Sequence, residues 1–217
     1  MTAIQTLLDN AVSLLIDKRA PSSMSISRAQ HLRTQTRGST VYKFTVGMHP
    51  ALNYADNRDL LEDYDATGRI VEEEVTLSNV SGGSWIMGYQ GEFTTSDISA
   101  TVAEGTSGTA NLVCNVSATV ASAGSAFVEK GDYIQVNGSR YPYQATARVL
   151  RGGGNTVTVP LNRPIVPEDG FTIGGQAVLV GTDCTFRVRM IQQPAYSVVP
   201  GRYIQWDGDM QLMEVLE

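Results

Sequence analysis

Short segments of alternating apolar and polar residues, separated by turns rich in glycine and serine, dominate the second half of this sequence. Residues 112–120, 127–136 and 141–150 each alternate in this way, and residues 123–125 and 137–139 lie between them. Because successive side chains of a strand point to opposite faces, the alternation predicts half-buried strands. Several short strands at close spacing are typical of a small barrel or sandwich. We therefore expect a mainly β protein.

Further strands are predicted on both sides of this region. Residues 41–48 place Tyr42, Phe44, Val46 and Met48 on one face of a strand. The other predicted strands cover residues 70–77, 156–161, 177–180, 184–191, 203–206 and 210–216. Small residues dominate from about residue 93 to residue 175, and larger side chains return afterwards. We expect a discontinuous domain of residues 1–92 and 176–217, into which a small β-barrel domain of residues 93–175 is inserted.

The N-terminal residues predict a helix over residues 3–18. Apolar side chains recur there at three- and four-residue spacing, namely Ile4, Leu7, Leu8, Ala11, Val12, Leu14 and Leu15. Thr2 and Gln5 have the spacing of a capping box, and Pro21 prevents the helix from continuing. The apolar face either covers a sheet of its own domain or docks on a neighbouring subunit, and we favour the first interpretation.

Positive charge gathers in one segment, residues 19–40, which has few apolar side chains. Its arginines are Arg19, Arg28, Arg33 and Arg37. Such a segment is either a solvated linker or an exposed arm that lies across the acidic surface of a neighbour. Arginine suits the second role, because its planar guanidinium makes paired hydrogen bonds with a carboxylate.

Negative charge dominates the rest of the chain. The 22 acidic residues outnumber the 16 Lys and Arg, which gives a formal charge of −6 and a pI near 4.9. Asp56, Asp59 and Glu62 form an acidic stretch, and residues 70–129 carry seven carboxylates without one Lys or Arg. This composition argues against a protein that holds nucleic acid tightly, because binding to phosphate needs clustered cations. The carboxylates either keep an outer surface solvated or form a surface that repels phosphate.

Residues with catalytic or metal-binding chemistry are scarce. The chain has two histidines, His31 and His49, and two cysteines, Cys114 and Cys184, which is too few for a usual zinc cluster. The cysteines have no motif spacing and are expected to be buried free thiols. No Gly-x-Ser-x-Gly elbow occurs. We expect no enzymatic activity, no metal and no cofactor, and we expect no signal peptide and no membrane span.

Two stretches carry a resemblance to a known family. The first contains GDYIQ at 131–135, YPY at 141–143 and TVTVPLNRP at 156–164. The second contains CTFRVRM at 184–190, YSVVP at 196–200 and YIQWDG at 203–208. Together with YKFTV at 42–46 and WIMGYQG at 85–91, they resemble tail proteins of contractile-tailed bacteriophages. The resemblance is to the tube-initiator and baseplate-hub proteins on which the tail tube polymerises.

The resemblance implies a tail-tube-like β-sandwich or barrel domain with an N-terminal helix, and a virion protein assembled in the host cytoplasm. The chain would form a homo-hexameric ring that initiates or caps the tail tube and stacks on adjacent tube and baseplate hub proteins. We expect subunit contacts at Arg19, Arg28, Arg33, Arg37, Tyr42 and Phe44. We expect Asp56, Asp59, Glu62, Glu72 and Glu74 to line the channel, whose wall would contact passing DNA only weakly.

Two other functions stay open at this point. A carbohydrate- or receptor-binding β module of a phage or bacterial surface assembly could use Trp85, Tyr141, Tyr143 or Trp206 as stacking platforms. A hydrolase could use Asp59 and Glu62 as a carboxylate pair.

Overall fold

The computed structural model describes residues 2–18, 20, 22–26, 32–36, 39–67, 72–80, 83–100, 108–116, 123–166 and 176–216. The protein is mainly β, as predicted, with 41% of residues in strands and 15% in helices. The strands are β1 (Ser13–Asp17), β2 (Ser22–Ile26), β3 (Leu32–Thr36), β4 (Lys43–Gly47), β5 (Glu72–Thr76), β6 (Ile98–Ala100), β7 (Asn111–Val116), β8 (Ala126–Val128), β9 (Tyr133–Val136), β10 (Tyr143–Gln144), β11 (Val149–Leu150), β12 (Thr156–Pro160), β13 (Val178–Val180), β14 (Thr185–Gln192), β15 (Tyr196–Val199), β16 (Tyr203–Trp206) and β17 (Met210–Glu214). The helices are α1 (Ala3–Asp9), α2 (Arg58–Thr67) and α3 (Gly83–Ile86), with short 3-10 helices η2 (Thr95–Asp97) and η3 (Gly181–Asp183).

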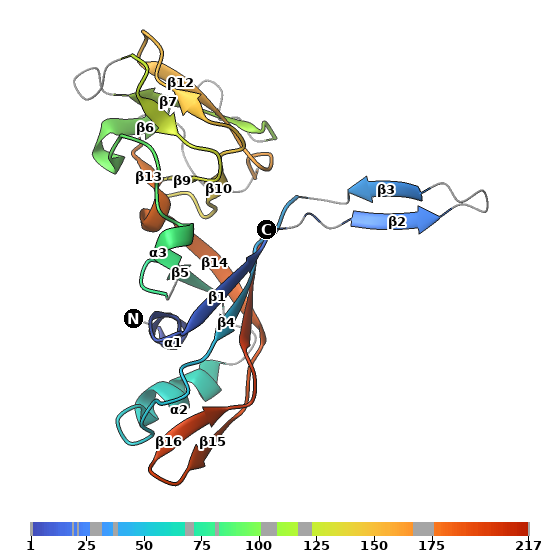
Figure 1. The fold of residues 1–217 in the computed structure, drawn as a ribbon, viewed down its shortest axis with the longest axis vertical. Helices are drawn as coiled ribbons and strands as arrows, with labels where there is room; N and C mark the ends of the chain where they lie inside the picture. The colour runs from blue at the N-terminus through green and yellow to red at the C-terminus, as the bar shows by residue number, and fades with distance from the viewer. Residues whose placement is uncertain are drawn as a thin grey trace.

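A five-stranded antiparallel sheet forms the middle of the molecule, with strand order β1-β4-β17-β14-β5 (Figure 1). The four strands that the sequence predicts for the core, at 41–48, 70–77, 184–191 and 210–216, all lie in this sheet. They come from opposite ends of the chain, so the sheet holds the N-terminal and C-terminal thirds together.

One face of this sheet is buried. Phe44, Leu212 and Phe186 from neighbouring strands are fully buried, in the same core cluster as Leu7 and Leu8 of α1. The rings of Phe44 and Phe186 meet edge to face at 5.0 Å between centroids. Helix α1 therefore packs against a sheet of its own chain, which is the interpretation that we favoured for the N-terminal helix.

The predicted helix over residues 3–18 is wrong beyond Asp9. Thr2 caps α1 through its side chain, which accepts a hydrogen bond from the backbone N–H of Gln5. The chain then turns, and β1 pairs with β4 along five residues. Leu14 and Ile16 alternate onto the buried face, which a strand permits, so pairing with β4 determines the structure more strongly than the helical spacing does.

Strands β6, β7, β9, β10, β12 and β13 lie above the central sheet in Figure 1. This upper part has a second cluster of buried side chains, which includes Phe93, Phe127, Ile134, Val159 and Val178. Around it are three small antiparallel sheets, with orders β12-β7-β6, β10-β9-β13 and β11-β8. The described residues of this region form no closed barrel, so the expectation of a small barrel for residues 93–175 is wrong. The predicted strand over 127–136 is interrupted at Gly131, whose φ of 108° lies in the left-handed region. The division of the chain into domains stays a prediction.

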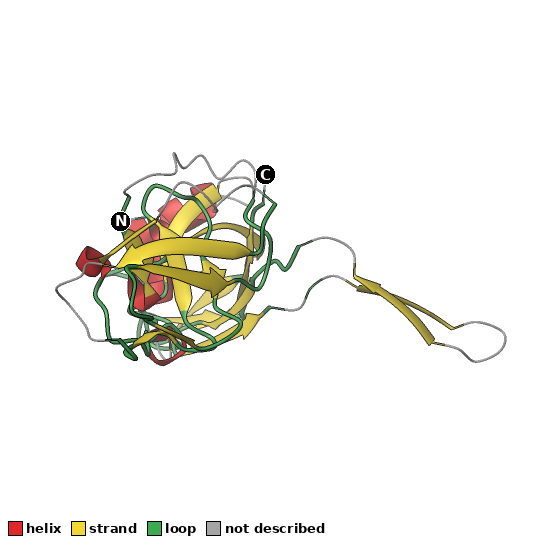
Figure 2. Cartoon of the chain, turned by 90° about the horizontal axis from the view of Figure 1, so that it is seen from above, coloured by secondary structure: helices red, strands yellow, loops and turns green. Residues whose placement is uncertain are grey.

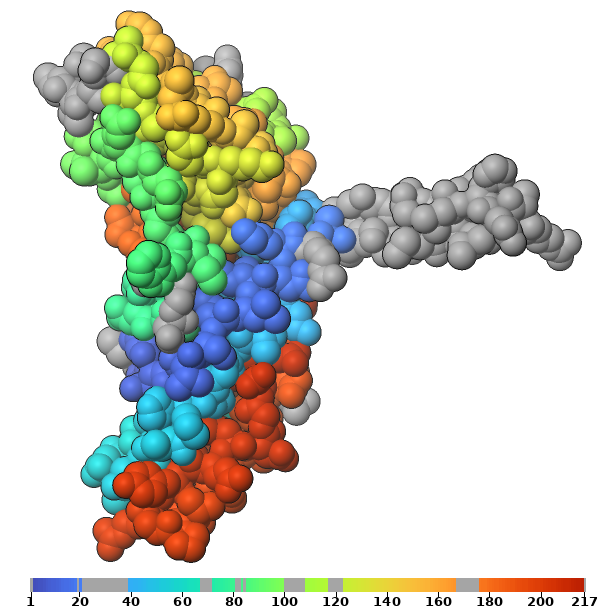
Figure 3. Space-filling view, in the orientation of Figure 1, coloured from blue at the N-terminus to red at the C-terminus, as the bar shows by residue number. Residues whose placement is uncertain are grey.

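Two smaller parts extend from the central sheet. Strands β2 and β3 form a hairpin that projects sideways, away from the rest of the molecule, in both Figure 1 and Figure 2. Helix α2 and the hairpin of β15 and β16 form the lower end of the molecule (Figures 1 and 3). The molecule is therefore long, with one lateral projection.

Candidate functional site

The arginine-rich segment contains a hairpin. Ser22 pairs with Thr36 and Ile26 with Leu32, so β2 and β3 are in register along five residues. Within the described part of the chain, this two-stranded sheet includes no third strand. We call residues 18–37, which include both strands, the arm. Of the predicted contact residues, Arg33 lies on β3, whereas Arg19, Arg28 and Arg37 lie outside the described residues.

Two of the predicted subunit contacts are corrected by the structure. Tyr42 and Phe44 are fully buried inside the chain, among Tyr133 and Phe186. Their alternating positions face the core cluster, which contains side chains of α1, the central sheet and β9. They therefore offer no surface to a second subunit.

The opposite face of the five-stranded sheet is open. Its exposed apolar side chains are Leu15, Ile191 and Met213, and Leu15 is 65% exposed. A groove of about 530 Å³ lies on this face, with Val41, Ile191, Met213 and Leu216 among its lining residues. A partly apolar sheet face of this kind suits a protein contact better than contact with water alone.

The charges on this open face balance. Cross-strand neighbours pair Asp17 with Lys43, Glu72 with Arg189 and Glu74 with Arg187. Glu72 also makes ion pairs with both arginines, at 2.5 Å from Arg189 and closer from Arg187. The open face is therefore close to electrically neutral.

The five carboxylates predicted to line a channel do not form one surface. Glu72 and Glu74 lie on β5, an edge strand of the central sheet. Asp56, Asp59 and Glu62 lie exposed at the lower end of the molecule, on α2 or just before it (Figure 3). Because Glu72 is paired with two cations, it adds little to a negative field on its face. The role of these carboxylates in lining a channel stays a prediction.

The free edges of the central sheet belong to β1 and β5. At β5, the side-chain amide of Gln5 from α1 satisfies both backbone groups of Thr76. Its Nε2 donates to the Thr76 carbonyl at 3.1 Å, and its Oε1 accepts from the Thr76 N–H at 2.9 Å. Gln5 thus occupies the place that a further strand would take at this end of β5, so α1 protects part of the edge from strand pairing.

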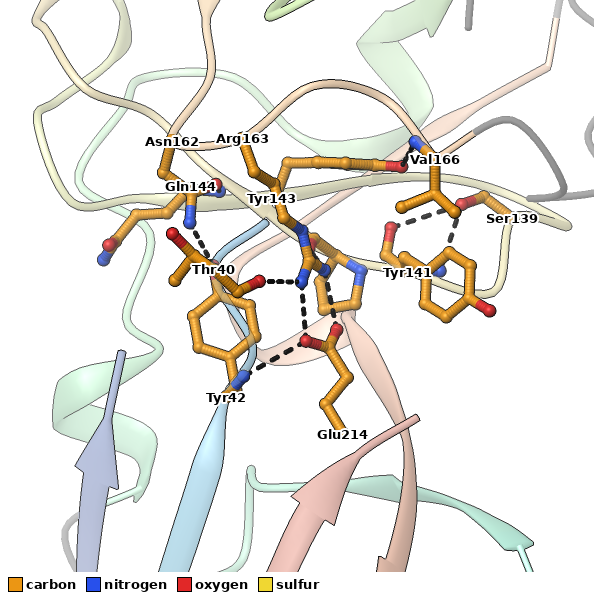
Figure 4. A network of polar contacts seen from close by, with 11 residues as sticks. Thr40, Tyr42, Ser139, Tyr141, Tyr143, Gln144, Asn162, Arg163, Val166 and Glu214 are labelled. Atoms are coloured by element: carbon orange, nitrogen blue, oxygen red, sulfur yellow. Dashed lines mark hydrogen bonds and ion pairs between the residues drawn. The ribbon is translucent and has the colours of Figure 1, made fainter. Parts of the chain in front are cut away.

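A buried ion pair joins the upper part of the molecule to the central sheet (Figure 4). The guanidinium of Arg163 donates to both carboxylate oxygens of Glu214, at 2.6 Å each, and both side chains are 0% exposed. Arg163 also donates to the carbonyls of Thr40 and Pro142, at 2.8 Å each. Glu214 in turn accepts from the backbone N–H of Tyr42. Residues from four distant parts of the chain are fixed together here.

Aromatic rings complete this junction. The guanidinium of Arg163 lies over the rings of Tyr42 and Tyr143, at 5.0 and 5.3 Å from their centroids. The Tyr42 hydroxyl accepts a hydrogen bond from Asn162 at 2.8 Å. The resulting network is buried and its charges are paired with each other, which suits a structural joint rather than a site that binds a ligand.

Burial controls the proton chemistry of the junction. Burial alone would lower the pKa of Arg163, but its hydrogen bonds and attraction to Glu214 outweigh this effect, so the pKa is raised. Burial raises the pKa of Tyr42 above its ordinary range, and the positive charge of Arg163 only partly opposes this. The tyrosine therefore stays protonated and the arginine charged across the physiological pH range.

The sequence analysis assigned no role to Arg163 or Glu214, although one signal pointed to the latter. Met210, Leu212 and Glu214 alternate along β17, so the carboxylate occupies an inward position. A charge at an inward position of a strand requires a partner. Nothing in the local pattern around Arg163 identifies it as that partner, since the two residues are 51 positions apart.

The other candidate residues are placed as follows. Tyr141 and Tyr143 are buried, so they cannot stack on a sugar, which corrects that expectation. Trp85 is 87% exposed, whereas Trp206 packs edge to face against Tyr64. Asp59 and Glu62 are exposed on α2 and lie in no apolar pocket of the kind that a general acid needs.

Cys114 and Cys184 are both free and buried, as predicted. Among the described residues, no group of three or more His, Cys, Asp or Glu side chains is arranged to hold a metal ion. Within the same residues, every helix is too short or too polar to cross a bilayer.

Comparison of the sequence with models of known protein families and with curated proteins found no match in either case.

Proposed function

We propose that this chain is a structural protein of a phage tail or baseplate, where copies of it form a ring that initiates or caps the tail tube around the path of the DNA. The observation that carries this proposal is the arm, a hairpin that leaves the body of the molecule and pairs with no third strand among the residues that the structure describes. An isolated two-stranded hairpin is marginally stable in water at best. An arm of this kind is stabilised when it lies against another molecule.

The rest of the surface supports an assembly role. The open face of the central sheet exposes apolar side chains beside balanced charges, which suits close contact with protein neighbours. The junction at Arg163 and Glu214 makes the two parts of the chain one stiff unit. In a unit of this kind the surfaces that contact two neighbours keep a fixed orientation to each other. A ring and a stacked tube both require this.

The resemblance of the sequence to tube-initiator and baseplate-hub proteins points to the same role. The resemblance also implies that six copies form the ring and that the ring stacks on tube and hub proteins. Both features are part of the proposal. Passing DNA would meet a wall that does not grip it, because the chain has a net charge of −6.

Imaging of phage tails tests this function. Cryo-electron microscopy of particles that contain a tagged copy of the chain should place the tag in a ring at one end of the tail tube. Particles that lack the tag, or carry it at scattered positions, would overturn the proposal.

A second candidate, a carbohydrate- or receptor-binding module, is favoured by one observation, the 87% exposed ring of Trp85. An exposed tryptophan can stack on a sugar ring. A glycan array tests this function: binding that disappears in Trp85→Ala would support it, and absence of binding to any glycan would reject it.

A further inference from the structure

Opposite charges gather in different segments of this one chain. The arm, residues 18–37, carries Lys18, Arg19, Arg28, Arg33 and Arg37 and has no Asp or Glu. We call residues 51–67 and 193–209 the acidic end, because they contain α2 and the hairpin of β15 and β16. The acidic end has seven carboxylates, Asp56, Asp59, Glu62, Asp63, Asp65, Asp207 and Asp209, against two arginines, Arg58 and Arg202. The arm and the acidic end thus carry net charges of +5 and −5.

Five of the seven carboxylates of the acidic end are available to a partner, whereas Asp65 accepts a hydrogen bond from the Tyr196 hydroxyl. Asp56, Asp59 and Glu62 are exposed, as are Asp207 and Asp209. No ion pair within the described residues neutralises these five side chains. The tip also exposes Val198 and Tyr203, which adds apolar area to the charged surface. A surface with both features can hold a basic, partly apolar hairpin.

The two surfaces cannot meet within one molecule. The arm projects sideways from the top of β1 and β4, whereas the acidic end is the lower tip of the molecule (Figures 1 and 2). In the space-filling view, α2 and residues 196–206 form that tip, well away from the base of the arm (Figure 3). A second copy of the chain offers the complement of each surface.

We propose that the arm of one copy docks on the acidic end of the next copy. This inference rests on the proposed function and identifies the surface that the arm contacts. It replaces the expected channel role of Asp56, Asp59 and Glu62 with a role in the subunit contact.

The geometry of this contact has a consequence for the assembly. Because the arm and the acidic end are different patches, one copy can hold a second copy by its arm while a third copy holds its acidic end, which makes a head-to-tail contact; reciprocal exchange of arms would instead give a two-fold symmetric dimer. Repetition of a head-to-tail contact gives a closed ring or an open helix. The attraction between exposed charges weakens with added salt, since the Debye length falls from about 10 Å at 0.1 M to about 3 Å at 1 M.

Disulfide cross-linking of full-length chains tests the inference. One variant carries Thr34→Cys on β3, and a second, with a mass tag, carries Ala66→Cys on α2, which is exposed and leaves every charge of the acidic end in place. The matched control replaces the second variant by a tagged Thr158→Cys, which is exposed on β12 in the upper part of the molecule. The native thiols do not interfere, because Cys114 and Cys184 are buried.

We expect the arm and α2 variants, mixed in low salt under mild oxidation, to give a mixed covalent dimer several-fold above the control mixture. High salt should reduce the yield. Adding Arg33→Glu to the arm variant should lower the yield by about fivefold, the size expected for loss and reversal of one exposed charge pair. Adding Arg33→Lys, which keeps the charge, should change the yield by less than about twofold.

A yield equal to that of the control mixture would overturn the inference. A second result would also overturn it: cross-linking at the control level together with binding of duplex DNA that Arg33→Glu abolishes. The arm would then bind a nucleic acid. The two proposals fail separately. A ring in tails with cross-linking at the control level overturns the docking and leaves the proposed function in place. Strong cross-linking by a chain that is absent from tails does the reverse.

Discussion

Arg163 and Glu214 place two full charges where water cannot reach them. Transfer of such charges from water is costly, and the paired hydrogen bonds at 2.6 Å offset that cost only while both partners are present. The pair therefore adds little net stability, but it fixes how the upper part of the molecule meets the central sheet.

The first prediction concerns removal of one partner. Arg163→Met or Glu214→Gln should lower the free energy of unfolding by about 3–5 kcal/mol, because a buried charge or polar group loses its partner. The double variant Arg163→Met with Glu214→Met should cost clearly less than the two single losses added together. Urea unfolding measures all three variants.

The control is the exposed ion pair between Arg148 and Glu129, whose arginine side chain is 60% exposed. Arg148→Met should cost less than about 1 kcal/mol. Equal losses for the buried and exposed arginines would contradict the account of the junction.

The second prediction concerns the two thiols. Burial raises the pKa of Cys114 to about 12, and it raises the pKa of Cys184 as well. The raised pKa keeps both thiols protonated at pH 8, and the thiol is far less reactive than the thiolate. Neither cysteine should react with a thiol reagent in the folded protein, and both should react once urea unfolds it. Rapid reaction of a folded sample at pH 8 would show that a thiol is exposed.

At the scale of single elements, the amide of Gln5 ties α1 to the edge of β5. The third prediction is that Gln5→Ala lowers the free energy of unfolding by about 1–2 kcal/mol, because two hydrogen bonds to Thr76 are lost. Alanine favours helices more than glutamine does, so a loss cannot come from helix propensity. Gln205→Ala, an exposed position on β16, is the control and should change stability by less than about 0.5 kcal/mol. Thermal unfolding of both variants measures the difference.

The fourth prediction concerns the arm. Strands β2 and β3 project away from the rest of the molecule in both views (Figures 1 and 2), and among the described residues they pair only with each other. Replacement of residues 22–36 by a short Gly-Ser linker should therefore shift the Tm by only about 2 °C or less. A large drop in Tm would show that the arm belongs to the folded core, and the assembly role assigned to it would lose its basis.

The sequence predicted those elements whose pattern is local. Alternation located β4, β16 and β17, because the side chains that point inward there are large and apolar. The alternation placed Tyr42 and Phe44 on the same face of the strand. It did not indicate which face is buried, since that depends on how distant parts of the chain pack. The helical spacing of residues 3–15 predicted too long a helix, because Leu14 and Ile16 fit a strand equally well and β4 was there to pair with it.

The sequence could not predict features that depend on distant residues. Arg163 and Glu214 meet only after the whole chain has folded, and Gln5 finds Thr76 across 71 positions. The five expected channel residues were grouped because they are close in sequence, but the fold divides them between β5 and the acidic end. The charge composition predicted a basic segment and an acidic segment. Only the fold showed that the arm and the acidic end lie in different parts of the molecule.

At the scale of the whole molecule, the chain combines a stiff body, a projecting basic arm and an acidic tip. These three parts make sense together if each copy holds the next by its arm and is held at its tip. This arrangement is the basis of our proposal that the protein is a ring-forming component of a phage tail.

The most direct test is cryo-electron microscopy of tails from a phage whose genome encodes this chain. The account predicts that copies of the chain form one ring around the tail axis, at an end of the tube, with each arm crossing to a neighbour. Two results would contradict the proposal: tails that are complete although they lack this chain, or copies that occur singly and do not encircle the tail axis.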